Sequence, residues 1–118
     1  MRLRVTSEAR RDVVNLLRRS ALEFGAEARN RYDRLLTSAY NELLADPQRF
    51  GVQLRDDIDA GLRLYHLRHS RKTRARDREV SRPRHVIAFR IFGADLVILR
   101  VLHEAMDVAG QLGEPEGD

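Results

Sequence analysis

The stretch RVLHEAMD, Arg100 to Asp107, holds the residues whose types and spacing most suggest chemistry. His103 and Asp107 would share a helical face at i and i+4, but a His-Glu-x-x-His zinc motif needs a second imidazole and a third ligand. His66 and His69 do not complete such a set, because residues three apart on a strand point to opposite faces. The chain also has no cysteine. We therefore predict no metal site and no cofactor, and expect each histidine to be solvated or hydrogen-bonded.

Metal-free cleavage of RNA is a second chemistry to weigh. It needs a base for the 2′-hydroxyl, an acid for the leaving oxygen, and cations for the pentavalent phosphorane. Four residues could supply these groups: His103, Arg100, Arg90 and Arg63. Histidine titrates near neutrality, so His103 is the natural acid or base. Structural roles are equal alternatives, since Arg100 could bind a neighbouring carboxylate and Asp107 could cap a helix or join that pair.

Positive charge is concentrated in residues 68–84, RHSRKTRARDREVSRPR. This segment has eight Lys or Arg and two acids, which leaves 14 basic and 16 acidic residues for the rest of a chain whose net charge is +4. Such a segment attracts phosphate or an acidic partner, and it has too few apolar groups to fold alone. Three interpretations stay open: nonspecific contact with DNA, docking of an acidic protein, or a solvated loop.

The first half of the chain predicts the elements that must position these residues. LRVT, residues 3–6, reads as a short strand, and Thr6 or Ser7 then caps a helix whose apolar residues recur at helical spacing as far as Phe24. Gly25 fits the end of that helix. A second helical pattern follows until Asp46-Pro47 stops it. The short link makes the two helices an antiparallel hairpin with their apolar stripes facing one core.

The second half predicts strands. LRLYHLRH, HVIAFRIF and ADLVILRVLH, residues 62–69, 85–92 and 94–103, are strand-like, and Gly93 marks a tight hairpin between the last two. The final strand is apolar on both faces, which is typical of an interior strand. We expect an α+β fold with an N-terminal strand, a helical hairpin and a three-stranded antiparallel meander, four strands in all.

Length and composition favour a single domain over residues 1–107, with residues 68–84 as an inserted basic loop and residues 108–118 as an acidic flexible tail. No apolar stretch is long enough to cross a bilayer. Together with the absence of cysteine, this indicates a cytoplasmic protein without a membrane partner.

Several stretches in order resemble the ParE branch of the ParE/RelE toxins. They are VTSEARRDVV, the FG that ends the first helix, the ADP that ends the second, GLRLYHLRH, and RVLHEAMD, and they span roughly residues 3–107. The resemblance implies the RelE/ParE-like fold and a toxin of a type II toxin-antitoxin pair. The basic loop departs from the family in being longer than the usual connection.

The resemblance leaves the target open, because function must be argued from the site rather than the fold. ParE toxins act on DNA gyrase by stabilising a cleaved gyrase-DNA complex and are not enzymes, whereas RelE toxins cut mRNA in the ribosome. This chain lacks the C-terminal tyrosine of several RelE-type ribonucleases and a lysine before the meander. We expect a gyrase inhibitor that contacts its target through Arg100, His103, Met106 and Asp107; a ribonuclease and an inactive antitoxin-binding module are the alternatives.

The resemblance also implies a ParD-like antitoxin whose disordered C-terminal segment folds onto the toxin. A helical hairpin laid over a sheet leaves a groove that such a segment can fill with apolar anchors. The candidate contacts are Leu17, Ala21 and Phe24, with Val97 and Leu99 if that face of the sheet is open. Ordinary core packing is the alternative for these residues.

Overall fold

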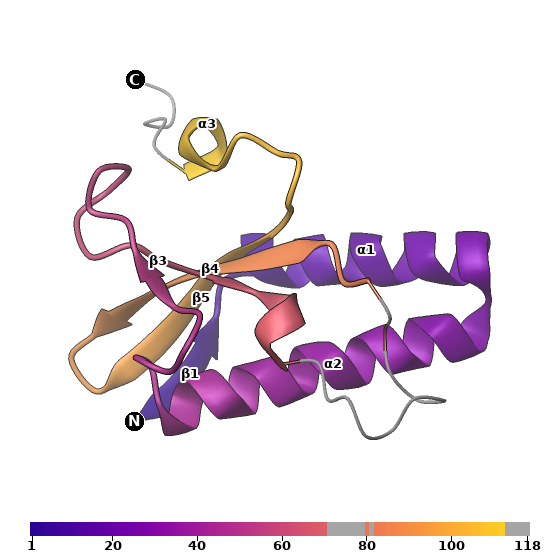
Figure 1. Ribbon diagram of the computed structural model, residues 1–118, viewed down its shortest axis with the longest axis horizontal. Helices are drawn as coiled ribbons and strands as arrows, with labels where there is room; N and C mark the ends of the chain where they lie inside the picture. Colours follow the sequence, from indigo (N-terminus) through magenta and orange to yellow (C-terminus); the bar gives the residue numbers. More distant parts are fainter. Residues whose placement is uncertain (71–79, 81, 113–118) are drawn as a thin grey trace.

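A computed structural model describes residues 1–70, 80 and 82–112. Two helices lie along one face of a single sheet, and both connect to it through short links (Figure 1). The elements in chain order are β1 (Arg2–Val5), α1 (Ser7–Phe24), α2 (Ala26–Ala45), β2 (Gln53–Leu54), β3 (Arg63–His66), the 3-10 helix η1 (Leu67–Ser70), β4 (His85–Phe92), β5 (Asp95–His103) and α3 (Val108–Leu112).

The sheet has five strands in the order β1-β5-β4-β3-β2. β1 pairs with β5 in parallel, and the other neighbours are antiparallel. β5 therefore lies inside the sheet, as its two-sided apolar pattern predicted, and the antiparallel meander is confirmed. The turn at Gly93, φ 57°, joins β4 to β5 as expected.

The expected count of four strands is wrong by one. The additional strand, β2, has two residues and pairs Gln53 with Leu64. Two exposed residues give no alternating pattern, so the sequence carried no signal for it. The strand expected over residues 62–69 is also shorter than predicted, because the chain turns into η1 after His66.

Local signals fix the helical hairpin as the sequence indicated. The Thr6 hydroxyl accepts the Ala9 N–H at 3.1 Å and so caps α1. Gly25, φ 95°, is the only residue between the two helices. A residue with a Cβ would be strained at this φ, so glycine allows the reversal. Asp46 ends α2 before Pro47.

The main core lies between the helices and the sheet. α2 contributes Leu36, Ala39 and Leu43, and the sheet contributes residues such as Ile87 and Phe89, all almost completely buried. Burying each large side chain of this kind contributes about 1.5–3 kcal/mol. This core fixes where the ends of β4 and β5 emerge beneath the helices.

The opposite face of the sheet carries a smaller cluster. Leu62, Leu64 and Ala88 are buried there, and Val108 and Leu112 of α3 pack against them. Residues 108–112 therefore form a helix where the sequence led us to expect a flexible tail, because two apolar residues four apart find an apolar patch to cover. The rest of that segment, 113–118, lies outside the described residues.

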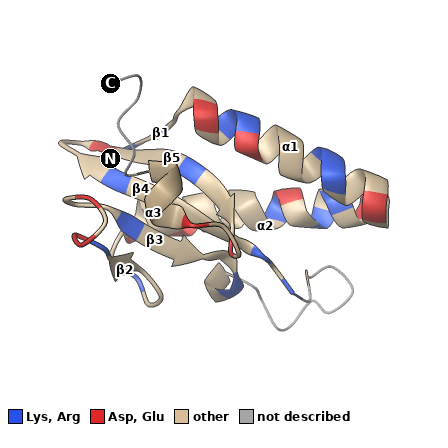
Figure 2. Cartoon of the chain, turned by 90° about the horizontal axis from the view of Figure 1, so that it is seen from above, with Lys and Arg blue, Asp and Glu red and all other residues tan. Residues whose placement is uncertain are grey.

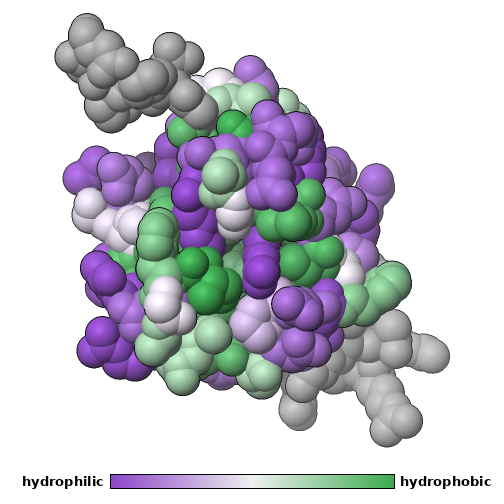
Figure 3. All heavy atoms as spheres, turned by 90° about the vertical axis from the view of Figure 1, so that its left-hand side faces the viewer, coloured by the Kyte–Doolittle hydropathy of each residue, from purple (hydrophilic) through white to green (hydrophobic). Residues whose placement is uncertain are grey.

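Surface apolar residues are scattered. At the end of the molecule shown in Figure 3, green apolar side chains form small areas separated by hydrophilic ones. Leu54 and Phe92 are more than half exposed, as are Leu22 and Phe24 of α1. Within the described part of the chain, no helix has the length and apolarity to cross a membrane.

Candidate functional site

Arg100 joins β5 to the first helix. Its guanidinium donates two hydrogen bonds to Asp12 of α1, Nε to Oδ2 at 2.8 Å and Nη2 to Oδ1 at 3.0 Å. Asp12 Oδ2 also accepts the Val101 N–H at 2.9 Å. The hydrogen bond with Asp12 raises the pKa of Arg100 above its ordinary value. Arg100 thus has the carboxylate partner that the sequence left as an alternative to a target contact.

His103 ends β5 beside a second imidazole. His85, at the start of β4, pairs with it across the sheet, and the ring centroids lie 5.4 Å apart, edge to face. The Tyr32 hydroxyl of α2 lies 2.7 Å from Nδ1 of His85 and accepts the Arg84 N–H at 3.0 Å. One tyrosine and two histidines from three elements therefore meet at the end of the sheet where β4 begins and β5 ends.

Burial keeps Tyr32 and His85 uncharged at neutral pH. It lowers the pKa of His85 to about 4, with a further contribution from the charge of His103. Burial also raises the pKa of Tyr32 to about 12, against the opposing effect of the Arg84 N–H. A neutral tyrosine that already accepts one hydrogen bond can donate its own proton to Nδ1 of His85.

The three side chains line a pocket of about 680 Å³ between the two helices and the sheet. Its walls come from α1, α2, the residues just before β4, and the facing ends of β4 and β5. Four of the lining residues are arginines and one is an acid: Arg19, Arg31, Arg82, Arg84 and Glu23. The pocket is therefore cationic, and we call it the arginine pocket.

Glu104 connects the rim of the arginine pocket to β3. Its carboxylate lies 2.7 Å from Nε2 of His66 and 3.3 Å from the Arg84 guanidinium. The hydrogen bond with His66 is the main cause of a lowered Glu104 pKa, and Arg84 adds to it. This contact accounts for His66 as a hydrogen-bonded histidine, as the sequence led us to expect.

The four ribonuclease candidates do not converge. His103 pairs with His85 at one end of the β4–β5 ladder, whereas Arg90 pairs with Val97 five residues along β4, roughly 17 Å away at ~3.3 Å per residue. Arg63 lies opposite Phe89, next to Arg90 in register but on the other face of the sheet.

Two of the arginines are also held by carboxylates, Arg100 by Asp12 and Arg90 by Asp59. His103 alone of the four lines the arginine pocket.

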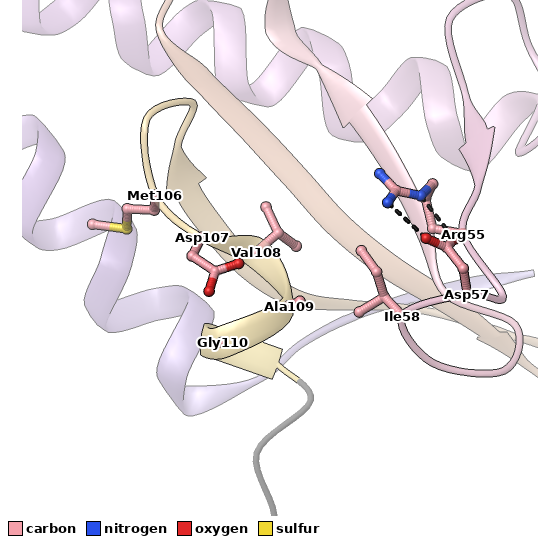
Figure 4. Close-up of a pocket in the computed structure, with 8 residues that line it drawn as sticks. All are labelled: Arg55, Asp57, Ile58, Met106, Asp107, Val108, Ala109 and Gly110. Atoms are coloured by element: carbon pink, nitrogen blue, oxygen red, sulfur yellow. Dashed lines mark hydrogen bonds and ion pairs between the residues drawn. The ribbon is translucent and has the colours of Figure 1, made fainter.

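The Met106 N–H donates to the His103 carbonyl at 2.9 Å, but Met106 and Asp107 line a second depression, of about 640 Å³, that His103 does not line (Figure 4). The first residues of α3 form one side of this depression. Arg55, which donates two hydrogen bonds to Asp57, lies on the other side. The Asp107 carbonyl accepts the Gln111 N–H, so Asp107 directly precedes α3 as its N-cap residue. The RVLHEAMD stretch therefore supplies two different surfaces rather than one site.

The antitoxin candidates divide by exposure. Leu17 and Val97 are buried, each 7% exposed, and Leu99 packs against the smaller cluster. Ala21 and Phe24 are exposed, and Phe24, 74% exposed, lines the arginine pocket. Of the five, these last two are accessible to a partner without rearrangement of the toxin.

Sequence reasoning missed most of the arginine pocket. Tyr32, His85, Arg19 and Arg31 were not among the candidate site residues. No spacing signal could have joined Tyr32 to His85, which is 53 residues away and meets it only through the fold. No group of three potential metal ligands occurs among residues 1–70, 80 and 82–112.

The helical hairpin, the parallel pairing of β1 with β5 and the antiparallel meander define a small α+β fold that is also found in a toxin-antitoxin protein. The solved structure titled "Chromosomal ParDE TA system from P. aeruginosa" matches with a TM-score of 0.65 at 18% sequence identity, over 87% of this chain and 95% of that one. At that identity the likeness establishes the fold.

Residues 3–108 match the family described as the ParE toxin of the type II toxin-antitoxin system parDE. The chain belongs to this family. A comparison with curated proteins gives no match.

Proposed function

We propose that this ParE-family protein is a cytoplasmic toxin that arrests growth by binding DNA gyrase and stabilising its cleaved complex with DNA. Family membership over residues 3–108 supports this proposal. The separation of Arg63, Arg90 and His103, described above, weighs against a ribonuclease of the RelE kind. In this proposal the protein acts by binding and is not itself an enzyme.

The target surface proposed here is the segment that leaves β5. His103 faces the arginine pocket, and Met106 is 47% exposed beside Asp107. Arg100 of β5 also forms an ion pair with Asp12 of α1, so its replacement affects the stability of the fold as well as contact with the target.

The direct test uses purified, antitoxin-free protein with gyrase, ATP and supercoiled or relaxed plasmid. Loss of supercoiling together with trapped linear DNA is the expected result. Met106→Ala should weaken trapping, whereas Met1→Ala, which changes an exposed methionine at the other end of the chain, should not. Unaffected gyrase would refute the proposal.

A ribosome-dependent mRNA endoribonuclease is the second candidate. The observation in its favour is that two histidines, a tyrosine and four arginines line one pocket. Cleavage of mRNA in a purified translation reaction, abolished by His103→Gln, would establish it. Inactivity in both assays would favour an inactive antitoxin-binding module.

Neutralisation is proposed to come from a ParD-like antitoxin whose disordered segment folds onto the helical hairpin. Phe24, an exposed aromatic side chain at the end of α1, is the anchor we expect to contribute most to affinity. Phe24→Asp should lower antitoxin affinity by about tenfold or more. Leu22→Asp is the matched control, because Leu22 is 81% exposed on the same helix and does not line the arginine pocket. Equal affinity of the two folded variants would remove Phe24 from the interface.

A further inference from the structure

The arginine pocket has more positive charge than the neighbouring carboxylates neutralise. Arg84 pairs with Glu104 at 3.3 Å, and Arg31 approaches Glu27 only to 4.0 Å. Arg19 and Arg82 have no carboxylate partner among the described residues. Because exposed ion pairs of this kind hold their partners weakly, all four guanidiniums can turn to an incoming anion.

The two histidines present donors rather than bases. Nδ1 of His85 faces the Tyr32 hydroxyl, which accepts the Arg84 N–H and so donates to that nitrogen. Nδ1 of His103 accepts the Ala105 N–H at 3.0 Å. A neutral imidazole whose Nδ1 accepts a hydrogen bond has its proton on Nε2. Both rings are therefore in the Nε2–H form, and neither Nε2 has a hydrogen-bond partner in the part of the chain that the structure describes.

Donors without acceptors suit an anion with several oxygens. Guanidinium groups bind phosphate oxygens through two parallel N–H bonds, and imidazole N–H groups can complete the set. A single carboxylate would satisfy one arginine and leave the others unused. The pocket also has an apolar wall, formed by Leu16, Phe24 and Ala28, against which the organic part of a ligand can lie.

We propose that the arginine pocket binds a phosphoryl group, either the terminal phosphate of a nucleotide or a phosphodiester of a nucleic-acid strand. Arg19 and Arg84 grip its oxygens, and the Nε2–H of His103 donates to it. The apolar wall with Phe24 receives the attached base, since a base can stack on an exposed aromatic ring. This site is independent of whether gyrase is the target of the toxin.

The experiment titrates full-length protein by calorimetry at low salt with three probes: inorganic phosphate, adenosine 5′-monophosphate, and a short single-stranded oligonucleotide without a terminal phosphate. Arg19→Gln is the test variant. Arg18→Gln is its control, because it removes the same charge from the neighbouring exposed position of α1, which does not line the pocket. Circular dichroism checks that both variants are folded.

Arg19→Gln should weaken binding by about tenfold or more, while Arg18→Gln should change it by less than about twofold. If inorganic phosphate or adenosine 5′-monophosphate binds and its affinity falls in Arg19→Gln but not in Arg18→Gln, the ligand of the pocket is a terminal phosphate. If only the oligonucleotide binds with these differences between the variants, the ligand is a phosphodiester. In either case the ¹⁵N signal of His103 Nε2 should shift on binding.

Three outcomes would overturn the proposal. One is the absence of binding for all three probes. Another is an equal loss in Arg18→Gln and Arg19→Gln, which would indicate unlocalised charge attraction. The third is displacement of the probes by a poly-glutamate peptide at the same concentration as by a phosphorylated ligand, which would make the pocket a carboxylate site for an acidic protein.

Discussion

His85 is a titratable residue whose state is set by its surroundings. Tyr32 occupies its Nδ1, and burial, the charge of His103 and the nearby Arg19 all disfavour the imidazolium, while Glu104 favours it too weakly to compensate. The pKa therefore falls from 6.5 to about 4. A histidine buried in the neutral form ties the stability of the fold to pH.

We predict that acid destabilises the protein through His85, with a loss that begins well above the pH range where carboxylates titrate. Below pH 6.5 the unfolded chain binds a proton at His85 that the native protein does not bind until about pH 4. Stability from this residue is therefore full above pH 6.5, falls as the pH drops towards 4, and changes no further below it, with a total loss on the order of 3 kcal/mol.

Urea unfolding at several pH values checks this prediction. His85→Gln cannot titrate but can still accept the Tyr32 proton, so its free energy of unfolding should decline less than that of the wild type between pH 6.5 and about 4. Parallel curves for the two proteins would show that His85 is not the responsible group.

The Asp12 carboxylate accepts hydrogen bonds from both the Arg100 guanidinium and the Val101 N–H, so its removal should lower the free energy of unfolding. Asp12→Ala would leave the half-buried Arg100 without its counterion and the Val101 N–H without an acceptor, for a loss of about 2–4 kcal/mol in the free energy of unfolding. Asp12→Asn keeps an acceptor and should lose less. Asp57→Ala removes a similar pair of hydrogen bonds, with Arg55, on the exposed surface and should change the free energy of unfolding little. A loss for Asp12→Ala no larger than for Asp57→Ala would contradict this account.

At the scale of elements, the capped start of α1 also determines how that helix meets the sheet. The Thr6 hydroxyl accepts the Ala9 N–H and donates to the Leu99 carbonyl of β5 at 2.8 Å. Thr6→Ala should therefore cost about 1–2 kcal/mol in urea unfolding, and Thr6→Ser, which keeps the hydroxyl, much less. If serine cost as much as alanine, the methyl group of Thr6 rather than its hydroxyl would be the stabilising part.

Elements with strong local signals were the ones predictable from the sequence. Thr6, Gly25 and Asp46 mark the ends of the two long helices, and the apolar run of β5 shows that it is interior. β2 and α3 were missed because short elements depend on what they pack against. The same limit applies to the candidate site: His103 was identified, but its neighbours Tyr32 and His85 come together only through the tertiary fold.

For the whole molecule, charge is distributed unevenly. Figure 2 shows acidic and basic residues mixed along α1, while the loop before β3 carries an acidic group, Asp56, Asp57 and Asp59. The basic segment 68–84 borders the arginine pocket through Arg82 and Arg84. Residues 71–79 and 81 of that segment lie outside the described residues.

We predict that residues 68–84 contact DNA nonspecifically and that this contact is governed by salt. Each phosphate neutralised releases counterions, so the logarithm of duplex affinity should fall linearly with the logarithm of salt concentration, with a slope of roughly 0.9 per contact. Replacing residues 70–82 by a Gly-Ser turn removes six of the segment's eight basic residues and should flatten that slope by several contacts. The control variant changes Asp56, Asp57 and Asp59 to asparagine, which raises the net charge at a site outside the basic segment. If the segment itself contacts DNA, the salt dependence of this variant should have the same slope as that of the wild type. An unchanged slope after the replacement, with toxicity and antitoxin binding retained, would mean that the segment is a solvated loop.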